Sequence, residues 1–298
     1  MSRSRTSHYP PPVKKIKPPD YLHLIKAAIA EDHIKKDAST YAIFTRPQKC
    51  KAYILAKDNG ILCGQQVAQT VFKTVDKKIK IALNKKDGAR LKPGIKVMQI
   101  EGNIQSVLTA ERIALNFLSF LSGISTRAHR ISSKLKPMGV KLLDTRKTLP
   151  GYRVLSKYAV HTGGGYNHRL HLAQLGMIKD NHITQAGSIE NAIRLFRKKY
   201  PRQKVEVEVE TFSQLKKVIT SQPEIILLDN MTGSQLKKCA AFIKEYNRKN
   251  KTTITSEASG GFTEQNLQKL QGTGVDYVSM GSLTNTVKPF DFSLEVFA

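Results

Sequence analysis

The stretches VEVEVE (residues 205–210) and EIILLDN (residues 224–230) decide the fold class of this chain. Each is a short apolar run that carries or ends in polar side chains, as expected of a β-strand in a covered sheet. Four further runs have a similar form: VKLLDT (140–145), LGMIKDN (175–181), TTITSEASGG (252–261) and DYVSMGS (276–282). Segments of helical pattern, such as SIENAIRLFRKKY, separate several of them. This alternation predicts repeated βα units and a mainly parallel sheet.

The spacing of acidic residues in these runs favours a barrel. Asp180, Glu208, Asp229 and Glu257 follow one another at intervals of 28, 21 and 28 residues. Such intervals are short for a decorated doubly wound sheet and suit compact barrel units. Polar residues recur at the predicted strand ends, which form one mouth holding the active site in an α/β barrel. Turn formation and helix capping explain any one of these residues, but they explain the whole series poorly.

The chain upstream of residue 138 has a mixed pattern. YLHLIKAAIAED indicates a helix, whereas KCKAYILAK, GILCG and KVMQIEG indicate strands between turns. In TAERIALNFLSFLSG the apolar residues share a wide helical face, with Thr109 as a candidate N-cap and Gly123 as the expected stop. We therefore expect a helix-plus-antiparallel-sheet domain, joined by a long helix to the half that holds the βα units.

The composition is that of a globular chain: 298 residues, 40% hydrophobic and 24% charged. Cys50, Cys63 and Cys239 lack a C-x-x-C spacing, so a zinc ribbon, a thioredoxin motif and a secreted disulfide framework are poor interpretations. The first twenty residues hold no apolar signal core, and no later stretch approaches the ~20 apolar residues that cross a bilayer. We expect a cytoplasmic protein with no membrane partner.

The charge balance is strongly basic, with 49 Lys and Arg against 23 Asp and Glu, a net charge of +26. Such a field attracts polyanions or anionic small molecules. Nucleic-acid binding is the second choice, because zinc-finger spacing, an RRM motif and a convincing helix-turn-helix are missing and the basic residues are dispersed. The basic, proline-rich residues 1–20 predict a flexible tail. A solvated extension is favoured there over an arm that binds an anionic partner.

Two acidic side chains at predicted strand ends indicate a chemical role. Alternation in VEVEVE places Glu206, Glu208 and Glu210 on one face. In an edge strand they would face water, whereas in a barrel strand a carboxylate needs a cation, a metal or a hydrogen-bonding ligand. We favour the functional interpretation for Glu208, and Asp229 fits the same reasoning. Together these two carboxylates could hold Mg²⁺ through water and phosphate oxygens.

Other stretches indicate anionic substrates. SEASGGF and YVSMGSLT end the last two predicted strands with small residues, whose backbone N–H groups can wrap a phosphate. SGG alone is better explained as a turn, but its pairing with Gly281 and Ser282 favours phosphate binding. Residues 144–183 mix Arg and Lys, which suits a substrate bearing carboxylates and phosphates. Zinc is a poor alternative, because the histidines there lack a Cys partner or an H-E-x-x-H spacing.

A linked series of motifs runs through roughly residues 50–290. In order, it comprises TAER.ALNFL..LSGIST, DTRKTLPGYR, KYAV..GGG.NHR, IKDNH, EVEVE, ILLDN, EASGG and GVDYVSMGSLT. This series closely resembles the quinolinate phosphoribosyltransferase family. The resemblance implies an α/β fold: an N-terminal α/β sandwich at 21–122, with 287–298 as a candidate last piece, and an incomplete (β/α) barrel carrying the active site at 123–286. It also implies a homodimer or homohexamer.

The same resemblance implies an activity and a set of residues. The enzyme would convert quinolinate and phosphoribosyl pyrophosphate, with Mg²⁺, to nicotinate mononucleotide, pyrophosphate and CO₂ in NAD biosynthesis. By motif match, the quinolinate carboxylates would contact Arg146, His168, Arg169 and Lys179, with Arg112 delivered from the neighbouring subunit. The phosphoribosyl pyrophosphate and metal positions would be Thr145, Lys147, Glu208 and Asp229. The 5′-phosphate loops would be Ser259, Gly260, Gly261, Gly281 and Ser282.

The chemistry of these residue types agrees with that activity. Displacement of pyrophosphate passes through a cation-like ribosyl centre, which the carboxylates of Glu208 and Asp229 would favour while Lys147 neutralises the leaving group. These three are the expected catalytic residues. Two alternatives remain at this point: a polyanion-binding protein that uses the basic surface, and an enzyme of the same fold with a different acceptor.

Overall fold

The structure, a computed structural model, describes residues 8–297 and divides them into two compact units. The barrel unit comprises residues 8–12, Arg130–Lys147 and Gly165–Ser282. The sandwich unit comprises Val13–His129, Thr148–Gly164 and residues 283–297. The two units therefore interleave along the chain. The divisions expected at residues 20, 122 and 286 stay predictions of domain limits.

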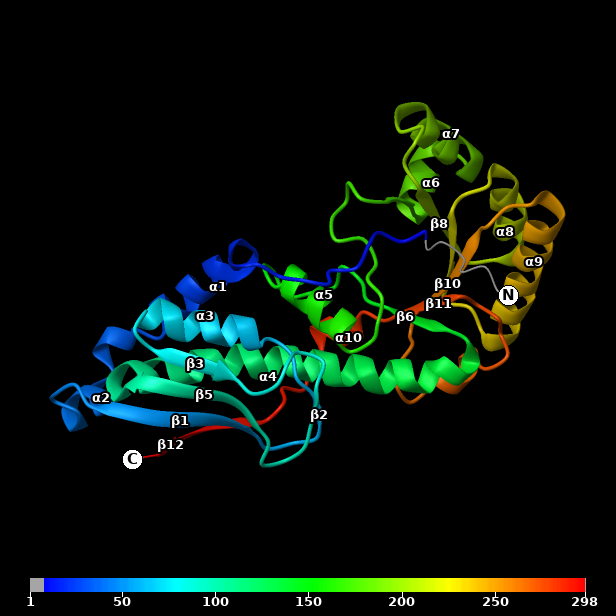
Figure 1. Cartoon of the computed structure of the whole chain (residues 1–298). Helices are drawn as coiled ribbons and strands as arrows, with labels where there is room; N and C mark the ends of the chain where they lie inside the picture. The colour runs from blue at the N-terminus through cyan, green and yellow to red at the C-terminus, as the bar shows by residue number, and fades with distance from the viewer. Residues whose placement is uncertain (1–7, 298) are drawn as a thin grey trace. The chain divides into compact units, whose positions relative to one another are not determined.

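Within the described residues, the barrel unit holds a six-stranded parallel sheet in the order β6-β11-β10-β9-β8-β7, of which β6, β8, β10 and β11 are labelled in Figure 1. Its strands are β6 (Lys141–Leu143), β7 (Gly176–Ile178), β8 (Val205–Val209), β9 (Ile225–Asp229), β10 (Thr255–Ser259) and β11 (Tyr277–Ser279). The first strand pairs with the last, as in a barrel, while β6 and β7 are not neighbours. An isolated bridge between Leu143 and Tyr166 lies on the open side of β6. The expected incomplete barrel is confirmed.

Helices follow the barrel strands, and hydroxyl caps begin several of them. The helices are α6 (Asp180–Ala186), α7 (Ile189–Lys199), α8 (Phe212–Val218), α9 (Gly233–Asn250) and α10 (Ser282–Asn285). Ser188, Thr211 and Thr232 each accept a hydrogen bond from the backbone N–H three residues later, which satisfies an orphan donor of the first turn. Short 3₁₀ turns in the chain lie at Ile34–Lys36, Lys136–Met138, Ile219–Ser221 and Leu267–Leu270.

Among the described residues, the sandwich unit holds a four-stranded antiparallel sheet in the order β12-β1-β5-β3. Its strands are β1 (Lys49–Ala56), β3 (Lys80–Leu83), β5 (Lys96–Asn103) and β12 (Phe292–Phe297), and a separate pair joins β2 (Gly60–Ile61) to β4 (Arg90–Leu91). The helices are α1 (Pro18–Glu31), α2 (Ala38–Ile43), α3 (Gln65–Val75), α4 (Ile104–Leu135) and α5 (Arg153–Thr162), and the residues of α4 from Arg130 onward belong to the barrel unit. The expected helix and antiparallel strands are confirmed, and the C-terminal segment returns to this sheet through β12.

Helix α4, the long green helix of Figure 1, differs from its expected limits. It begins before Thr109, whose hydroxyl donates to the Gln105 carbonyl 2.9 Å away, and it continues through Gly123. A β-carbon at Gly123 would lie 2.4 Å from the Lys288 carbonyl oxygen, so close packing rather than helix termination requires glycine. Residues 104–138 are long and apolar enough to span a membrane, yet 67% of the apolar window is buried, as in a core helix.

The expected flexible tail, residues 1–20, includes seven residues that lie outside the described part of the chain, among them Arg3 and Arg5. From His8 onward the stretch makes defined contacts. Tyr9 is 6% exposed, Ile16 is 4% exposed, and α1 begins at Pro18. A description as flexible tail therefore does not fit residues 8–20, because apolar side chains within this basic and proline-rich stretch are buried.

Candidate active site

The loop after β6 is tied to residues 167–169 by a buried carboxylate. Asp144 is fully buried, and its Oδ1 accepts a hydrogen bond from the His168 backbone N–H at 2.9 Å. Its Oδ2 accepts from the Asn167 side chain at 2.6 Å. Charge-assisted bonds of this kind fix geometry strongly. Asp144 therefore sets the path of the chain on both sides of the opening between β6 and β7.

His168 and Arg169 are buried and bonded to protein partners. Nδ1 of His168 accepts the Arg169 backbone N–H at 2.7 Å, and Nε2 lies 2.9 Å from Oε2 of Glu206. The Arg169 guanidinium donates to the Leu175 carbonyl at 2.9 Å. Burial lowers the pKa of Arg169, and the nearby charge of Glu206 opposes that shift. Arg169 is thus a cation held in one place beside a buried acid.

Two strands of the barrel sheet each carry a fully buried glutamate. Glu206 is on β8 and Glu257 on β10, and both pair with β9, opposite Ile225 and Leu227. Burial raises the pKa of Glu206 to about 8, with Arg169 and Lys179 opposing the shift. Burial also raises the pKa of Glu257 to about 7, helped by the charge of Glu206. Two buried carboxyls so close together favour holding a proton between them.

Glu208 and Asp229 form a second acidic group, nearer the strand ends. Glu208 is half-buried on β8, and the Lys179 ammonium lies 3.4 Å from its Oε2. Burial raises the pKa of Glu208, and Asp229 contributes to this rise while Lys179 opposes it. Asp229 ends β9 and accepts a hydrogen bond from Asn230 Nδ2 at 2.6 Å. This set of carboxylate oxygens suits a hard divalent cation such as Mg²⁺.

The glycine loops after β10 and β11 are built for close approach. Gly260 and Gly261 have φ values of +93° and +62°, a region that favours glycine. A β-carbon at Gly260 would lie 2.1 Å from Asn230 Oδ1, and one at Gly281 would lie 2.8 Å from Cδ of Lys147. Lys147 therefore passes directly over the loop that follows β11, which brings the first and last strand ends together.

The structure places nearly all the expected site residues in the barrel unit; most lie at or just after the carboxyl ends of its strands, and His168 and Arg169 lie in the segment that leads into β7. The expected site residues of the barrel unit are Thr145, Arg146, Lys147, His168, Arg169, Lys179, Glu208, Asp229, Ser259, Gly260, Gly261, Gly281 and Ser282. Arg112 differs: it is exposed on α4 and belongs to the sandwich unit. Their functional roles stay predictions.

Sequence reasoning missed several residues that support this site. Glu206 was visible in the alternation of VEVEVE, but nothing local separated it from Glu208. Glu257 served only to mark a strand interval, and Asp144 only to mark a strand end. Tyr9, whose hydroxyl donates to Glu257, lies in the stretch expected to be a tail. Its one signal was an aromatic residue in a basic and proline-rich segment.

The fold and the site together define a class: an α/β enzyme with an incomplete barrel, whose strand ends carry cations, paired carboxylates and glycine loops suited to anionic substrates. The family model described as quinolinate phosphoribosyl transferase, C-terminal domain, matches residues 124–295. The model for the N-terminal domain of the same family matches residues 37–122.

Relatives agree over nearly the whole chain. A probable carboxylating nicotinate-nucleotide pyrophosphorylase of Bacillus subtilis is 38% identical, covering 92% of this chain and 92% of that protein. A chloroplastic carboxylating nicotinate-nucleotide pyrophosphorylase of Arabidopsis thaliana is 36% identical, over 94% of this chain and 85% of its own length. The solved nicotinate-nucleotide pyrophosphorylase of Francisella tularensis is 33% identical with a TM-score of 0.90, covering 97% of this chain and all of that one.

This chain belongs to the quinolinate phosphoribosyltransferase family. It is an enzyme, a phosphoribosyltransferase of de novo NAD biosynthesis that acts on quinolinate. The resemblance drawn from the motifs is confirmed, and with it the transfer reaction in preference to polyanion binding or another acceptor.

Proposed function

We propose that the enzyme carries out its reaction at the carboxyl ends of the barrel strands, with the residues described above in defined roles. It joins quinolinate to phosphoribosyl pyrophosphate, giving nicotinate mononucleotide, pyrophosphate and CO₂. Arg146, Arg169 and Lys179 bind the quinolinate carboxylates, since guanidinium forks and ammonium groups match carboxylates. His168 belongs to the same group and orients Arg169, because both of its ring nitrogens face protein partners.

The sugar phosphate lies along the other strand ends in this proposal. Ser259, Gly260 and Gly261 wrap the 5′-phosphate with backbone N–H groups, and Gly281 and Ser282 complete that loop. Thr145 and Lys147 contact the pyrophosphate. The packing of Lys147 on Gly281 brings this cation next to the phosphate loop, so a single bound sugar phosphate can contact both.

The transfer step needs little acid–base chemistry. As the pyridine nitrogen displaces pyrophosphate, positive charge develops on the ribosyl carbon. Glu208 and Asp229 stabilise that charge, and Lys147 stabilises the charge on the leaving group. Lys179, 3.4 Å from Glu208, opposes the rise in the Glu208 pKa that burial causes and so favours the carboxylate form.

We propose Mg²⁺ as the cofactor, held by Glu208 and Asp229 through water and pyrophosphate oxygens. When bound, it would neutralise pyrophosphate charge. The fit rests on two neighbouring carboxylates, since the charge of Asp229 helps to raise the pKa of Glu208 and a bound cation would offset that effect. Loss of CO₂ then follows from the transfer, because the alkylated ring nitrogen stabilises the carbanion at the adjacent carbon, which takes a proton from water to give nicotinate mononucleotide. Arg146 and Arg169 keep the ring oriented during that step.

The test separates turnover from binding. We expect Glu208→Ala and Asp229→Ala each to lower kcat by about 100-fold, because a charge that acts in the transition state is removed. Their quinolinate affinity should stay within about threefold of the wild type, since neither contacts the carboxylates. We expect Arg146→Ala to weaken quinolinate binding by about tenfold.

Quinolinate-dependent CO₂ release would give kcat, and calorimetric titration would give affinity. Glu210→Ala is the matched control, because Glu210 follows Glu208 along the same face and is exposed. Wild-type turnover in both carboxylate variants would end the proposed mechanism.

We also propose that the enzyme acts in the cytoplasm as a homodimer, or as a hexamer built from dimers. Arg112 supports the assembly: it is an exposed arginine on α4, in the sandwich unit, whereas the other expected site residues lie in the barrel unit. In a symmetric assembly such a residue can complete a neighbour's site.

A further inference from the structure

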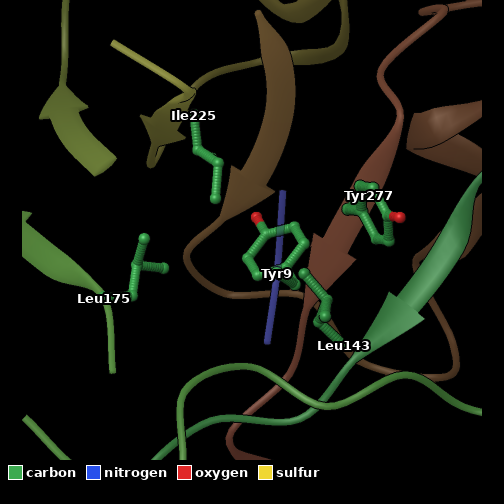
Figure 2. Packing of buried hydrophobic residues seen from close by; sticks show 5 residues of the cluster. All are labelled: Tyr9, Leu143, Leu175, Ile225 and Tyr277. Atoms are coloured by element: carbon green, nitrogen blue, oxygen red, sulfur yellow. The ribbon is translucent and has the colours of Figure 1, made fainter. Parts of the chain in front are cut away.

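The segment at residues 8–12 belongs to the barrel unit, although the chain continues in the sandwich unit from Val13. His8 is hydrogen-bonded through Nε2 to the Thr253 carbonyl at 2.7 Å, just before β10. Tyr9 inserts its ring among side chains from distant parts of the barrel (Figure 2). These side chains are Leu143, Leu175, Ile225 and Tyr277. Residues 8–12, which we call the N-terminal arm, are therefore part of the barrel unit and contribute Tyr9 to its core.

Tyr9 is connected to His168 in two ways: directly through its ring, and indirectly through Glu257. Its ring meets the His168 ring edge-on, with centroids 5.2 Å apart and planes at 60°. Its hydroxyl donates a hydrogen bond to Oε2 of Glu257, and that oxygen lies 3.8 Å from Nε2 of His168. All three side chains are buried. A change at Tyr9 thus acts on the His168 ring both by packing and through the carboxylate.

The contacts continue from His168 to Arg169. Nδ1 of His168 accepts the Arg169 backbone N–H, and the guanidinium of Arg169 is anchored on the Leu175 carbonyl. Leu175 also belongs to the cluster around Tyr9. The backbone of Arg169 is consequently one residue removed from the Tyr9 ring, through His168, and its guanidinium is anchored on a residue of the cluster that surrounds Tyr9.

We propose that Tyr9 is a positioning residue for quinolinate binding: its ring and hydroxyl hold His168 and Leu175, and these hold Arg169 in its binding orientation. The inference rests on the proposed role of Arg169 in binding quinolinate. It gives the N-terminal arm a function at the active site through buried contacts alone. Binding groups need such support, because small displacements of a charged clamp are costly.

The test uses full-length Tyr9→Ala, Tyr9→Leu and Tyr9→Phe, with steady-state kinetics for each substrate. Tyr9→Ala should raise the quinolinate KM by about tenfold, while the phosphoribosyl pyrophosphate KM stays within about twofold. Tyr9→Leu should be intermediate, because it refills part of the volume. Tyr9→Phe keeps the ring and should recover most of the loss, leaving an effect of about threefold from the lost hydrogen bond.

Tyr21→Phe is the matched control, because Tyr21 is a fully buried tyrosine whose hydroxyl bonds Thr70 at 3.2 Å in the sandwich unit. We expect it to leave both KM values unchanged. Equal changes in both KM values across the Tyr9 series, or a loss that follows thermal stability alone, would make Tyr9 an ordinary core residue and overturn the proposal.

Arg169→Lys separates this inference from the one on which it rests. An unchanged quinolinate KM in Arg169→Lys would refute the proposed role of Arg169. A raised KM there, with unchanged values in all Tyr9 variants, would refute only the role of Tyr9. The double variant Tyr9→Phe with Arg169→Lys should be less than additive, since both act on one group.

Elemental analysis of the purified enzyme supplies a last check. Oxygen and nitrogen atoms of His168, Glu206 and Glu257 lie within 4.8 Å of one another, a spacing that a metal ion could also bridge. If the wild type contained one metal ion per chain and Glu257→Gln lost it, the metal ion would be what connects these side chains. The proposed link between Tyr9 and His168 would then be overturned. We expect wild type and Glu257→Gln to have the same metal content.

Discussion

Glu206 and Glu257 lie on β8 and β10, on either side of β9, and both are fully buried. Burial makes the charged form of each carboxyl expensive, so the protein keeps a proton in the pair at pH values where a surface glutamate is ionised. His168 and Arg169 supply the compensating contacts. At the scale of single residues, the buried acid pair Glu206 and Glu257 therefore helps to position His168 and Arg169, which are among the residues proposed to bind substrate.

This burial predicts how stability depends on pH. Glu257 has an ordinary pKa of 4.5 and a folded-state pKa of about 7, so the folded state binds its proton more tightly than the unfolded state does. Stability from this group is then fully present below pH 4.5 and is lost as pH rises towards about 7. Glu257→Gln cannot ionise, so its free energy of unfolding should fall less between pH 5 and pH 7 than that of the wild type.

Urea unfolding at several pH values would measure this slope. Glu210→Gln is the control, because Glu210 is exposed and should leave the slope unchanged. The same slope in Glu257→Gln and the wild type would contradict the prediction. Glu206, with a pKa of about 8, should still produce a residual fall in both proteins.

Helix α4 shows at the scale of elements how packing overrides a local signal. Gly123 has the form of a helix stop, and Thr109 has the form of an N-cap. The helix nevertheless runs from Ile104 to Leu135, because the apolar residues on its face are buried along its whole length. Gly123 is needed where the Lys288 carbonyl approaches the helix. Strands behave differently, since each predicted barrel strand forms where its apolar run lies.

Gly123→Ala tests that explanation. Helix propensity alone would stabilise the helix by about 1 kcal/mol. A β-carbon only 2.4 Å from the Lys288 oxygen requires backbone movement, and such overpacking costs about 1–3 kcal/mol. We expect net destabilisation in urea unfolding. Ser133→Ala, at an exposed position of the same helix, should be neutral or slightly stabilising. A Gly123→Ala protein more stable than the wild type would refute the packing explanation.

The whole molecule carries a net charge of +26, which favours the approach of two anionic substrates. The expected site residues divide between the units, with Arg112 on the sandwich unit and the others on the barrel unit. If each subunit supplies its Arg112 to the active site of its neighbour, each site of a dimer contains Arg112 from one subunit and the barrel-unit residues of the other. The oligomer is then part of the catalytic machinery rather than only a source of stability.

Subunit mixing tests this arrangement. Arg112→Ala and Glu208→Ala should each be nearly inactive alone. Refolding them together in equal amounts should restore about a quarter of the wild-type sites, because half of the dimers are mixed and each mixed dimer has one intact site. Mixing Glu208→Ala with Asp229→Ala should restore nothing, since both changes fall on the same unit. Full activity of Arg112→Ala alone, or no recovery in the first mixture, would contradict shared sites.

The sequence by itself determined the parallel strands, a barrel of βα units and the strand-end residues, and the family resemblance added that the barrel is incomplete. These follow from local patterns: an apolar run forms a strand, and the chain that follows Asp229 or Ser259 must turn at the end of that strand. The family motifs are local in the same sense. Such features can be predicted without knowing which residues pack against them.

Only the tertiary structure decided which glutamate of VEVEVE is buried deepest, why Gly123 interrupts no helix, and where Tyr9 lies. Tyr9 and Glu257 are separated by 248 positions, and no periodicity spans that distance. Their contact joins the start of the described chain to β10, which lies between β11 and β9 in the assembled sheet. Burial and long-range packing are properties of the assembled barrel, so no local pattern in the sequence encodes them.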